Sequence, residues 1–567
     1  MRHRAARRLG RALLLTLLAL LIPAGAGAQG VDTLLLDGKV VTLDRASSVH
    51  EALAVRDGTI VAVGRSADLR ALAGPGTRVV DLQGRTVIPG LIDSHMHAIR
   101  AALSYATEVN WIGTRSIPEA LDRIRAAARA ARPGVWLIVA GGWTEQQFEE
   151  RRRPTQAELL SAAPDHPVYI QLFYSAVLLT PAGLKALGIA GDADVPPRGV
   201  LERDGAGHPT GWIRGDNPTI TGLFARLPTP TFEEKVEGTR RFFRELNRLG
   251  LTGVIDPGGF NMAPRDYLPL FRVWQDHELT VRVAYSLFAQ RRGAELEDFQ
   301  SLTQLLPMGF GDDLLRFNGI GESVTWAMYN NDNPAEADKA KLAEVARWAA
   351  ERRMALTIHW SNEKSVGHLL EVFERVNRDV PIGGLRWSIA HLNDATPATL
   401  DRMKALGVGW LMQDAMYFSG ETFIKERGAE AARRTPPIGT GMRIGVPIGA
   451  GTDAHRVMSY NPFAALQWML DGKTIGGTPM RGPEETPTRE EGLRLYTLGS
   501  AWFAFDEGRR GSLEVGRLAD LAVLSEDYLS VPVEKVGRIE SLLTMVGGRV
   551  VYAVGAFQAL EERRPTR

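Results

Sequence analysis

Residues 86–97 read Thr-Val-Ile-Pro-Gly-Leu-Ile-Asp-Ser-His-Met-His, an apolar run that leads directly into two histidines. The run predicts a strand over Val87–His95. On a strand, residues i and i+2 point to the same face, so His95 and His97 would bring two imidazoles together. An H-x-H pair by itself leaves metal binding and a structural or surface role equally open. The strand that precedes this pair favours metal binding.

Seven further runs share this character, since each is short and apolar and stands next to an amphipathic stretch of helical length. The eight predicted strands are Val87–His95, Leu251–Asp256, Thr280–Phe288, Leu314–Glu322, Ala355–Trp360, Arg386–His391, Val408–Gln413 and Val446–Asp453. Helical patterns between them include Phe232–Leu249, Pro334–Arg353 and Lys364–Arg378. Alternating strands and helices predict a parallel sheet, and eight such units predict an α/β fold of the (β/α)₈ TIM-barrel type over residues 87–510.

The two ends of the chain, residues 29–86 and 511–567, are β-rich and contain short runs separated by turns. Asp37-Gly38 and Asp57-Gly58 are hairpin signals, and Gly547-Gly548 marks a turn near the C-terminus. We expect both ends to form one small two-part β-sandwich domain. The stretch from about residue 100 to 230 is too long for one crossover and contains strand-like runs of its own. We interpret it as an inserted cap over the barrel mouth.

The composition excludes several classes of function. A net charge of +1 over 567 residues, without a basic stripe, argues against nucleic-acid binding. The chain has no cysteine, so any metal must be held by histidine and carboxylate. The expected partner is a small-molecule substrate, and assembly into a homo-oligomer stays open.

The first 28 residues have the order of a secretory signal peptide. Five arginines precede the apolar run Ala12–Ile22, which is too short to span a bilayer comfortably, and Ala26-Gly27-Ala28 offers a cleavage site. We expect an exported protein, periplasmic or secreted, without a stable membrane span after cleavage. An uncleaved anchor is the alternative, and the loose motif around Arg7-Arg8 leaves the Sec and twin-arginine routes open.

Four of the predicted strands end in side chains that bind metals. His95 and His97 follow the first strand, His359 and His391 close the fifth and sixth, and Asp453 closes the eighth. In a (β/α)₈ barrel the carboxyl ends of all strands face one mouth, where active sites lie. Four histidines and an aspartate there predict a site for zinc or a similar divalent ion. Any one of these histidines alone fits a core or surface role better, but their joint placement favours the metal.

Several motifs together resemble a known family. They are Pro-Gly-Leu-Ile-Asp-Ser-His-Met-His at 89–97, Gly142-Trp143, Arg153-Pro154-Thr155, His359, His391, Gly451-Thr452-Asp453 and Gly-Ser-Leu-Glu-Val-Gly-Arg-Leu-Ala-Asp at 511–520. In this combination the chain resembles the metal-dependent amidohydrolases, specifically their YtcJ-like branch, amidohydrolase family 3, over essentially the whole mature sequence. The resemblance implies hydrolysis of a carbon–nitrogen bond other than a peptide bond, in an amide or cyclic amide. Ester or lactone hydrolysis, deamination, or a ligand-binding relative without turnover are the alternatives.

The resemblance also implies roles for individual residues. His95, His97 and Asp453 would bind one metal, and His359 and His391 would bind or approach a second, so one or two ions are expected. A metal-activated water would attack the substrate carbonyl, with Asp453 taking its proton and passing it to the leaving group. The metal or a histidine would stabilise the oxyanion, and we place Asp453 and His391 as the catalytic residues.

The chain departs from the family pattern in two places. Many binuclear relatives carry a strand-four lysine whose carbamate bridges two metals, but residues 314–322 contain no lysine and end in Glu322. Our hypothesis is that Glu322 is a bridging metal ligand in place of the carbamate. The alternative is a salt-bridged or capping glutamate beside a single metal. In the cap, Tyr174-Ser175 stands where many relatives have Gly-His, which affects the expected substrate more than the reaction.

Other candidates carry less weight. His455 would either reach substrate or be an ordinary loop histidine, and we expect Asp256 to order the loops at the end of its strand. Several aromatic side chains near strand ends or in the cap serve as core or line an apolar pocket, which would favour a hydrophobic amide. These aromatic residues are Trp143, Tyr174, Trp212, Trp326, Tyr329, Trp360 and Tyr417.

Overall fold

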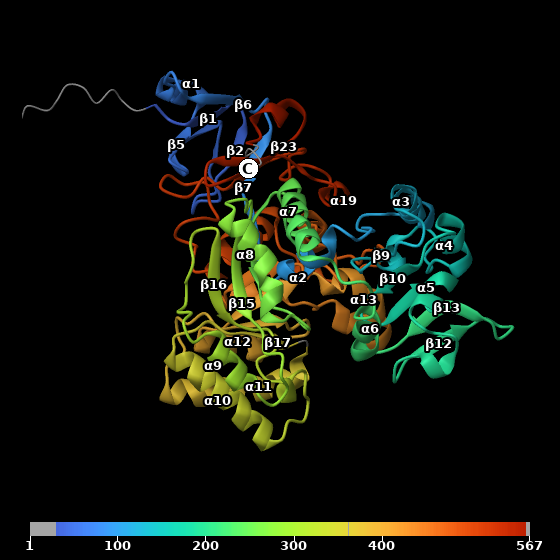
Figure 1. Ribbon diagram of the computed structural model, residues 1–567. Coiled ribbons are helices and arrows are strands. Elements are labelled where there is room, and N and C mark those ends of the chain that lie inside the picture. Colours follow the sequence, from blue (N-terminus) through green and yellow to red (C-terminus); the bar gives the residue numbers. More distant parts are fainter. Residues whose placement is uncertain (1–29, 361, 563–567) are drawn as a thin grey trace, which may run out of the picture.

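The computed structural model describes residues 30–360 and 362–562, so the predicted signal peptide lies outside the described residues. The centre of the molecule is a mixed α/β unit with two four-stranded parallel sheets (Figure 1). The first sheet has the order β16-β15-β14-β8 and the second β17-β18-β19-β20. The strands are β8 (Leu91–Asp93), β14 (Leu251–Asp256), β15 (Arg282–Leu287), β16 (Leu315–Ile320), β17 (Thr357–Trp360), β18 (Ser388–His391), β19 (Gly409–Gln413) and β20 (Ile448–Gly451).

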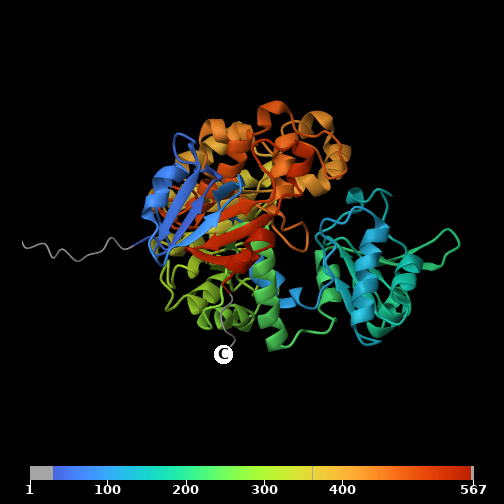
Figure 2. The same cartoon turned by 90° about the horizontal axis from the view of Figure 1, so that it is seen from above.

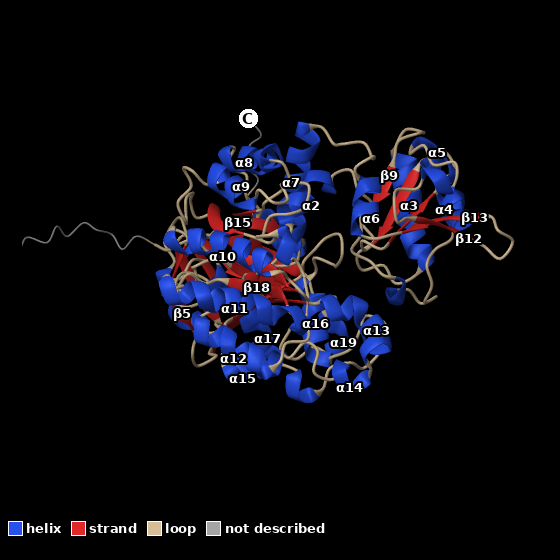
Figure 3. Ribbon diagram, turned by 90° about the horizontal axis from the view of Figure 1, so that it is seen from below, coloured by secondary structure: helices blue, strands red, loops and turns tan. Residues whose placement is uncertain are grey.

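The two sheets contact each other along both outer strands. A parallel bridge between Ile320 and Leu356 joins the edges of β16 and β17. On the other side, the N–H of Ser94, just after β8, donates to the carbonyl of Ala450 in β20 over 3.0 Å. Figure 3 shows helices around the outside of these strands. The α/β class predicted from the sequence is therefore confirmed.

The helices form where the sequence supplies both a cap and an apolar face. In α7 the Thr231 hydroxyl accepts from the Glu234 N–H over 3.3 Å, and the Glu234 carboxylate accepts from the Thr231 N–H over 2.7 Å. Val236, Phe243 and Leu246 of this helix are buried. The main helices around the two sheets are α2 (Ala98–Tyr105), α7 (Phe232–Arg248), α8 (Leu268–Gln275), α9 (Glu295–Leu302), α10 (Glu336–Glu351), α11 (Glu363–Asp379), α12 (Pro397–Leu406), α13 (Ala415–Arg427), α15 (Ile438–Ile444) and α16 (Pro462–Asp471).

The first predicted strand, Val87–His95, is wrong in one respect, because the structure divides it into two strands. β7 (Thr86–Pro89) pairs antiparallel with β21 (Leu521–Leu524), whereas β8 pairs with β14. The chain changes sheets at Gly90, where a Cβ would collide with the side chain of Thr252. His95 and His97 consequently lie in the loop between β8 and α2 rather than on a strand.

The strands from the two chain ends form two further sheets, which share one buried hydrophobic cluster. The six-stranded sheet, β23-β22-β21-β7-β2-β3, contains strands from both ends. The four-stranded sheet has the order β5-β4-β1-β6. Their remaining strands are β1 (Thr33–Leu36), β2 (Lys39–Val41), β3 (Val49–His50), β4 (Ala52–Arg56), β5 (Thr59–Gly64), β6 (Arg78–Asp81), β22 (Ser541–Val546) and β23 (Arg549–Ala553).

Two of the three predicted turns join paired strands. Asp57-Gly58 joins β4 to β5, and Gly547-Gly548 joins β22 to β23, each as an antiparallel pair. The hairpin predicted at Asp37-Gly38 is wrong, because β1 and β2 lie in different sheets. There the turn carries the chain from one sheet to the other, which local turn chemistry does not distinguish from a hairpin.

Residues 117–224 build a separate layer, a five-stranded sheet of order β12-β13-β11-β10-β9 with four helices. Figure 2 shows this layer beside the body of the protein. Its elements are α3 (Ile117–Ala130), β9 (Leu137–Val139), α4 (Gln156–Ala162), β10 (Val168–Leu172), β11 (Ala176–Leu179), α5 (Pro181–Ala186), β12 (Val200–Arg203), β13 (Pro209–Arg214) and α6 (Asn217–Phe224). We call it the inserted sheet.

The inserted sheet touches loops that follow the central strands. The N–H of Val109 donates to the carbonyl of Ile138 over 2.7 Å, and Arg456, from the loop after β20, reaches the carbonyl of Ala140. Within the described ranges, no helix has both the length and the apolar character needed to cross a bilayer.

Candidate metal centre

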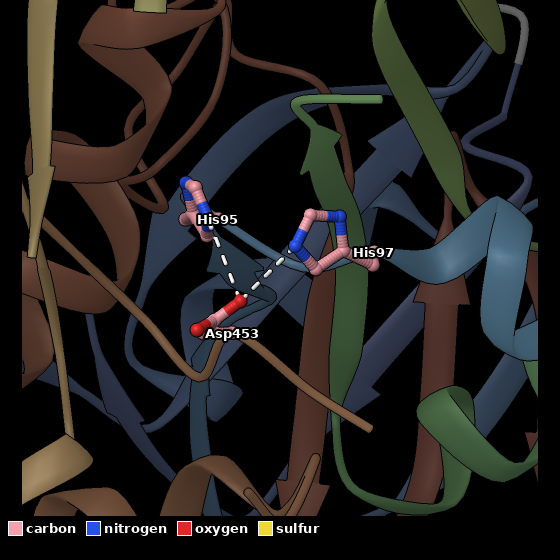
Figure 4. Close-up of side chains that lie close together, drawn as sticks. All are labelled: His95, His97 and Asp453. Carbon is pink, nitrogen blue, oxygen red and sulfur yellow. Dashed lines mark ion pairs between the residues drawn. The ribbon is translucent and has the colours of Figure 1, made fainter. Parts of the chain in front are cut away.

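The structure brings the six predicted metal ligands into one cluster. They come from the ends of five central strands or the loops just after them, and each side chain is at most 16% exposed. Figure 4 shows three of them, with the imidazoles of His95 and His97 directed toward the carboxylate of Asp453. The full set is His95, His97, Glu322, His359, His391 and Asp453.

The first half of the cluster gathers around Asp453. Its Oδ1 atom lies 3.1 Å from Nε2 of His97 and 3.6 Å from Nε2 of His95. Nitrogen and oxygen ligands about 2.0–2.2 Å from a tetrahedral zinc ion lie about 3.3 Å from each other. The three atoms therefore have the spacing of ligands that share one ion.

The second half gathers around Glu322, which reaches both halves. Its Oε1 contacts Nδ1 of His359 and lies 3.0 Å from Nε2 of His391. Its Oε2 lies 3.4 Å from Nε2 of His97 and 3.9 Å from Nε2 of His95. One carboxylate thus presents an oxygen to each pair of histidines, which is the placement that a bridging ligand requires.

Some buried polar atoms in the cluster have no hydrogen-bond partner among the described residues. They include both ring nitrogens of His95 and Oε2 of Glu322. A buried polar atom without a partner is costly, and a cation would provide one. Two sets of three donor atoms lie within 4.8 Å of one another, namely His95, His97 and Asp453, and His95, Glu322 and His391. The donors are all nitrogen and oxygen, so the residues fit a divalent ion such as zinc.

Neighbouring groups hold these ligands in place. Asp93 accepts from the N–H of His95 over 2.9 Å and from the hydroxyl of Thr452 over 2.7 Å, which ties β8 to the end of β20. Nδ1 of His97 bonds to the carbonyl of Gly258, leaving Nε2 to face Asp453. Such contacts fix the tautomer and orientation of a metal-binding histidine.

Two more contacts complete this support. The N–H of His391 donates to Oε1 of Gln413 over 2.8 Å. Asp256 accepts from the N–H groups of Ile99 and Gly258 over 2.7 and 2.8 Å, so it orders the loops as the sequence predicted. Sequence reasoning missed the roles of Asp93 and Gln413. The position of Asp93, two residues before His95, was the available signal for the first.

The charge state of the two cluster carboxylates follows from their histidines. Burial by itself raises the pKa of Asp453, but the imidazoles of His95 and His97 outweigh it and bring that pKa below its ordinary value. Burial also opposes ionisation of Glu322, whose pKa is nevertheless well below the ordinary value because of His359 and His391. Both carboxylates are therefore ionised at neutral pH.

Some sequence candidates lie outside the cluster. His455 is buried with its Nε2 2.9 Å from Glu108, and it belongs to neither donor set. Trp143 and Trp360 are core residues. The ring of Tyr329 stacks on His359 with centroids 4.3 Å apart, so Tyr329 is in direct contact with the cluster.

A sequence profile described as "Amidohydrolase family" matches residues 78–552. The chain belongs to the amidohydrolase family. Membership confirms the family and the hydrolase class predicted from the sequence motifs. The match extends from the first β-rich end, through the central strands and the inserted sheet, to β23.

Individual relatives cover nearly the whole chain. N-substituted formamide deformylase of Arthrobacter pascens is 25% identical over 92% of this chain and 98% of its own length. The putative amidohydrolase YtcJ of Bacillus subtilis (strain 168) is 23% identical, covering 91% of this chain and 98% of that protein. The zinc complex of atrazine chlorohydrolase TrzN from Arthrobacter aurescens TC1 aligns with a TM-score of 0.54 at 16% identity. That alignment covers 92% of this chain and 95% of the other, and it shows a shared fold.

Proposed function

We propose that the protein is a metal-dependent hydrolase that cleaves a carbon–nitrogen bond other than a peptide bond, in an amide or cyclic amide. The observation that carries this proposal is the cluster itself, in which four histidines and two ionised carboxylates from distant strand ends meet with unpartnered donor atoms. The similar deformylase is named for the cleavage of an amide bond, which supports an amide over an ester.

We also propose the architecture that positions this cluster. The eight parallel strands would form a closed (β/α)₈ barrel within residues 90–510, with the metal centre at the carboxyl ends of its strands. The terminal sheets would form a two-part β-sandwich from residues 30–89 and 511–562, and the inserted sheet would be the cap. The leader sequence supports export to the periplasm or medium after cleavage near residue 28. The N-terminal sequence of the mature protein tests that step.

The residues divide between two ion positions. His95, His97 and Asp453 would hold one ion, and His359 and His391 would hold a second, with Glu322 shared between them. When bound, a divalent ion supplies Lewis-acid chemistry that polarises a carbonyl and lowers the pKa of water. Zinc is the ion that this donor set favours.

The chain's own residues then move the proton. Asp453 is ionised, so it accepts the proton of the attacking water and delivers it to the leaving nitrogen. His391 lies with Nδ1 3.9 Å from Oδ2 of Asp453. A histidine that holds an ion through Nε2 is neutral and carries its proton on Nδ1, so this N–H is the group through which His391 would donate to the developing oxyanion.

The test combines metal analysis with reaction products. We expect the purified mature protein to contain at least one equivalent of divalent metal, to release amine and acid from amides, and to place one oxygen of solvent water in the acid. The His95→Ala variant should lose both metal and activity, whereas His208→Ala, at an exposed histidine of the inserted sheet, should keep both. Metal-free wild-type protein, or metal content unchanged in His95→Ala, would contradict the proposal.

A further inference from the structure

A cavity of about 420 Å³ lies between the inserted sheet and the loops that follow the central strands. Ile138, Tyr174 and Phe224 line it from the inserted sheet and the segments next to it. Arg100 from α2 and Arg456 from the loop after β20 line the opposite side. A volume of this size accommodates a small organic molecule.

The cavity has an excess of positive charge. Its lining contains four cationic side chains, from Arg100, Lys235, Arg265 and Arg456, against the carboxylates of Glu108 and Asp266. Lys235 is neutralised by Asp266, with Nζ and Oδ1 3.2 Å apart. Glu108 is engaged by His455 at 2.9 Å, and its other oxygen is 3.9 Å from Nη2 of Arg456. Arg265 is exposed to solvent.

Arg100 is the cation that stays without a partner. Within the described part of the chain it makes no hydrogen bond or ion pair, and its Nε atom is buried. Arg456, by comparison, is held by Glu108 and by the ring of Phe224, whose centroid is 3.8 Å from the guanidinium carbon. A buried guanidinium nitrogen without an acceptor is costly, so an anionic ligand at this position would be favourable.

The position of Arg100 connects this cavity with the metal centre. Arg100 follows His97 by three residues, in the first turn of α2. Its Cδ and Nε atoms pack 3.5 and 3.7 Å from the point where a Cβ on Gly259 would stand. The carbonyl of the adjacent Gly258 bonds to Nδ1 of His97. One loop thus supports both a metal ligand and the unpartnered guanidinium.

We propose that this cavity binds a carboxylate group carried by an amide substrate, with Arg100 pairing to that carboxylate while the amide group reaches the metal centre. The inference rests on the proposed hydrolase function and narrows it to amides that carry a carboxylate. A guanidinium binds a carboxylate through two parallel hydrogen bonds, a geometry that a single ammonium does not reproduce. The apolar walls at Ile138, Phe224 and Met262 would accommodate the hydrocarbon part of the substrate.

The test uses two probe compounds that differ only in the carboxylate, N-acetylphenylalanine and N-acetylphenethylamine. We expect wild-type protein to have the higher kcat/KM for the acid, and Arg100→Gln to reduce the ratio of the two kcat/KM values by about 10- to 100-fold. Arg100→Lys should recover only part of that ratio. Arg265→Gln removes an exposed charge from the same cavity and should change the ratio by less than about threefold. An unchanged ratio in Arg100→Gln would overturn the inference.

Calorimetric binding of the two compounds separates this inference from the proposed reaction. If the acid binds more tightly than the neutral analogue, and only when Arg100 is present, the carboxylate site is supported even without turnover. In that case absence of hydrolysis counts against the hydrolase proposal alone. If the neutral compound is bound and hydrolysed as well as the acid, the hydrolase proposal stands and the carboxylate site is refuted. Failure of the acid to bind to the wild-type protein also refutes the site.

Discussion

Two sets of buried carboxyl groups lie at the ends of the central strands, and their pKa values are shifted in opposite directions. Asp453 and Glu322 stand among histidines, and their pKa values are below the ordinary range although burial opposes this. Around Asp93, Asp256 and Asp414 the neighbouring groups do not outweigh burial, although the charge of His97 opposes it at Asp256. Burial raises the pKa of Asp93 to about 7 and that of Asp256 to about 6, and it brings that of Asp414 well above its ordinary value.

The comparison shows that imidazoles in direct contact, rather than depth, decide which of these carboxyl groups has a pKa below its ordinary value. All five side chains are buried, so the desolvation penalty has the same sign for each. Asp453 and Glu322 carry negative charge into the cluster, where a divalent cation would offset it. Asp93 and Asp256 accept hydrogen bonds from backbone N–H groups, whereas the oxygens of Asp414 have no hydrogen-bond partner among the described residues. The lowered pKa values of Asp453 and Glu322 and their position support the proposal that these two residues are metal ligands.

The largest expected effect comes from removing the charge of Asp453. Asp453→Asn keeps the shape of the side chain but takes away both the anionic ligand and the proton acceptor. We expect kcat on an amide substrate to fall by about 10³-fold or more, within the range for loss of a general base. Elemental analysis should show less bound metal. If Asp453→Asn kept both its metal and its rate, the lowered pKa of Asp453 would be unrelated to metal binding and catalysis.

The next largest effect is expected at Glu322 and tests whether its role differs from that of Asp453. Glu322→Gln keeps one oxygen toward the histidines but removes the negative charge shared between the two halves. We expect metal content to fall from about two equivalents to about one, with a loss of activity of about 10- to 100-fold. An unchanged stoichiometry and rate would make Glu322 a structural residue beside a single ion.

The sequence predicted the residues of the metal-binding cluster well, because each of them stands at the end of a recognisable apolar run. Each of His359, His391 and Asp453 ends an apolar run, and the parallel arrangement brings such ends together regardless of distance along the chain. Glu322 was identified as the only anionic oxygen donor near the end of its strand. The split at Gly90 was not predictable in this way, because the pairing partners Leu521–Leu524 lie more than four hundred residues away.

The surroundings of Asp93, Asp256 and Asp414, and the cavity, were harder to predict because they depend on contacts between segments that are distant in the sequence. Whether a buried aspartate meets a backbone N–H, an imidazole or nothing depends on segments brought together by folding. Asp93 was visible in the motif, but its bond to Thr452 joins residues at opposite ends of the central unit. Arg100 similarly has no sequence signal, since its importance comes from the lack of a partner in the folded protein.

A smaller effect is expected from Asp256, which supports the loop behind His97. Asp256→Asn leaves one oxygen to serve the two N–H groups of Ile99 and Gly258. We expect the midpoint of thermal unfolding to fall by about one degree, corresponding to about 1 kcal/mol for one lost hydrogen bond. Metal affinity should weaken by about tenfold through the carbonyl of Gly258. Scanning calorimetry and metal titration measure the two effects. Loss of all bound metal would instead show that Asp256 is as necessary for metal binding as Asp453 is expected to be.

An effect confined to the pH dependence of stability is expected at Asp414, whose two carboxylate oxygens have no hydrogen-bond partner among the described residues. Burial is the main cause that raises its native pKa above 3.8, and the charge of Asp93 adds to it. Between 3.8 and that raised value the native state holds a proton that the unfolded chain releases. Stability from this group is therefore complete below 3.8 and falls as pH rises, by up to about 1.4 kcal/mol per pH unit.

Asp414→Asn removes this titration and keeps the size of the side chain. We expect the urea midpoint of the variant to gain on the wild type as pH increases from 5 to 7. The exposed Asp165→Asn, a control with the same chemistry, should not change the pH profile. Parallel profiles for Asp414→Asn and wild type would show that Asp414 is already ionised in the native protein. That result would place Asp414 with Asp453 and Glu322, and it would weaken the conclusion that contacts with imidazoles set the pKa values of the buried carboxyl groups here.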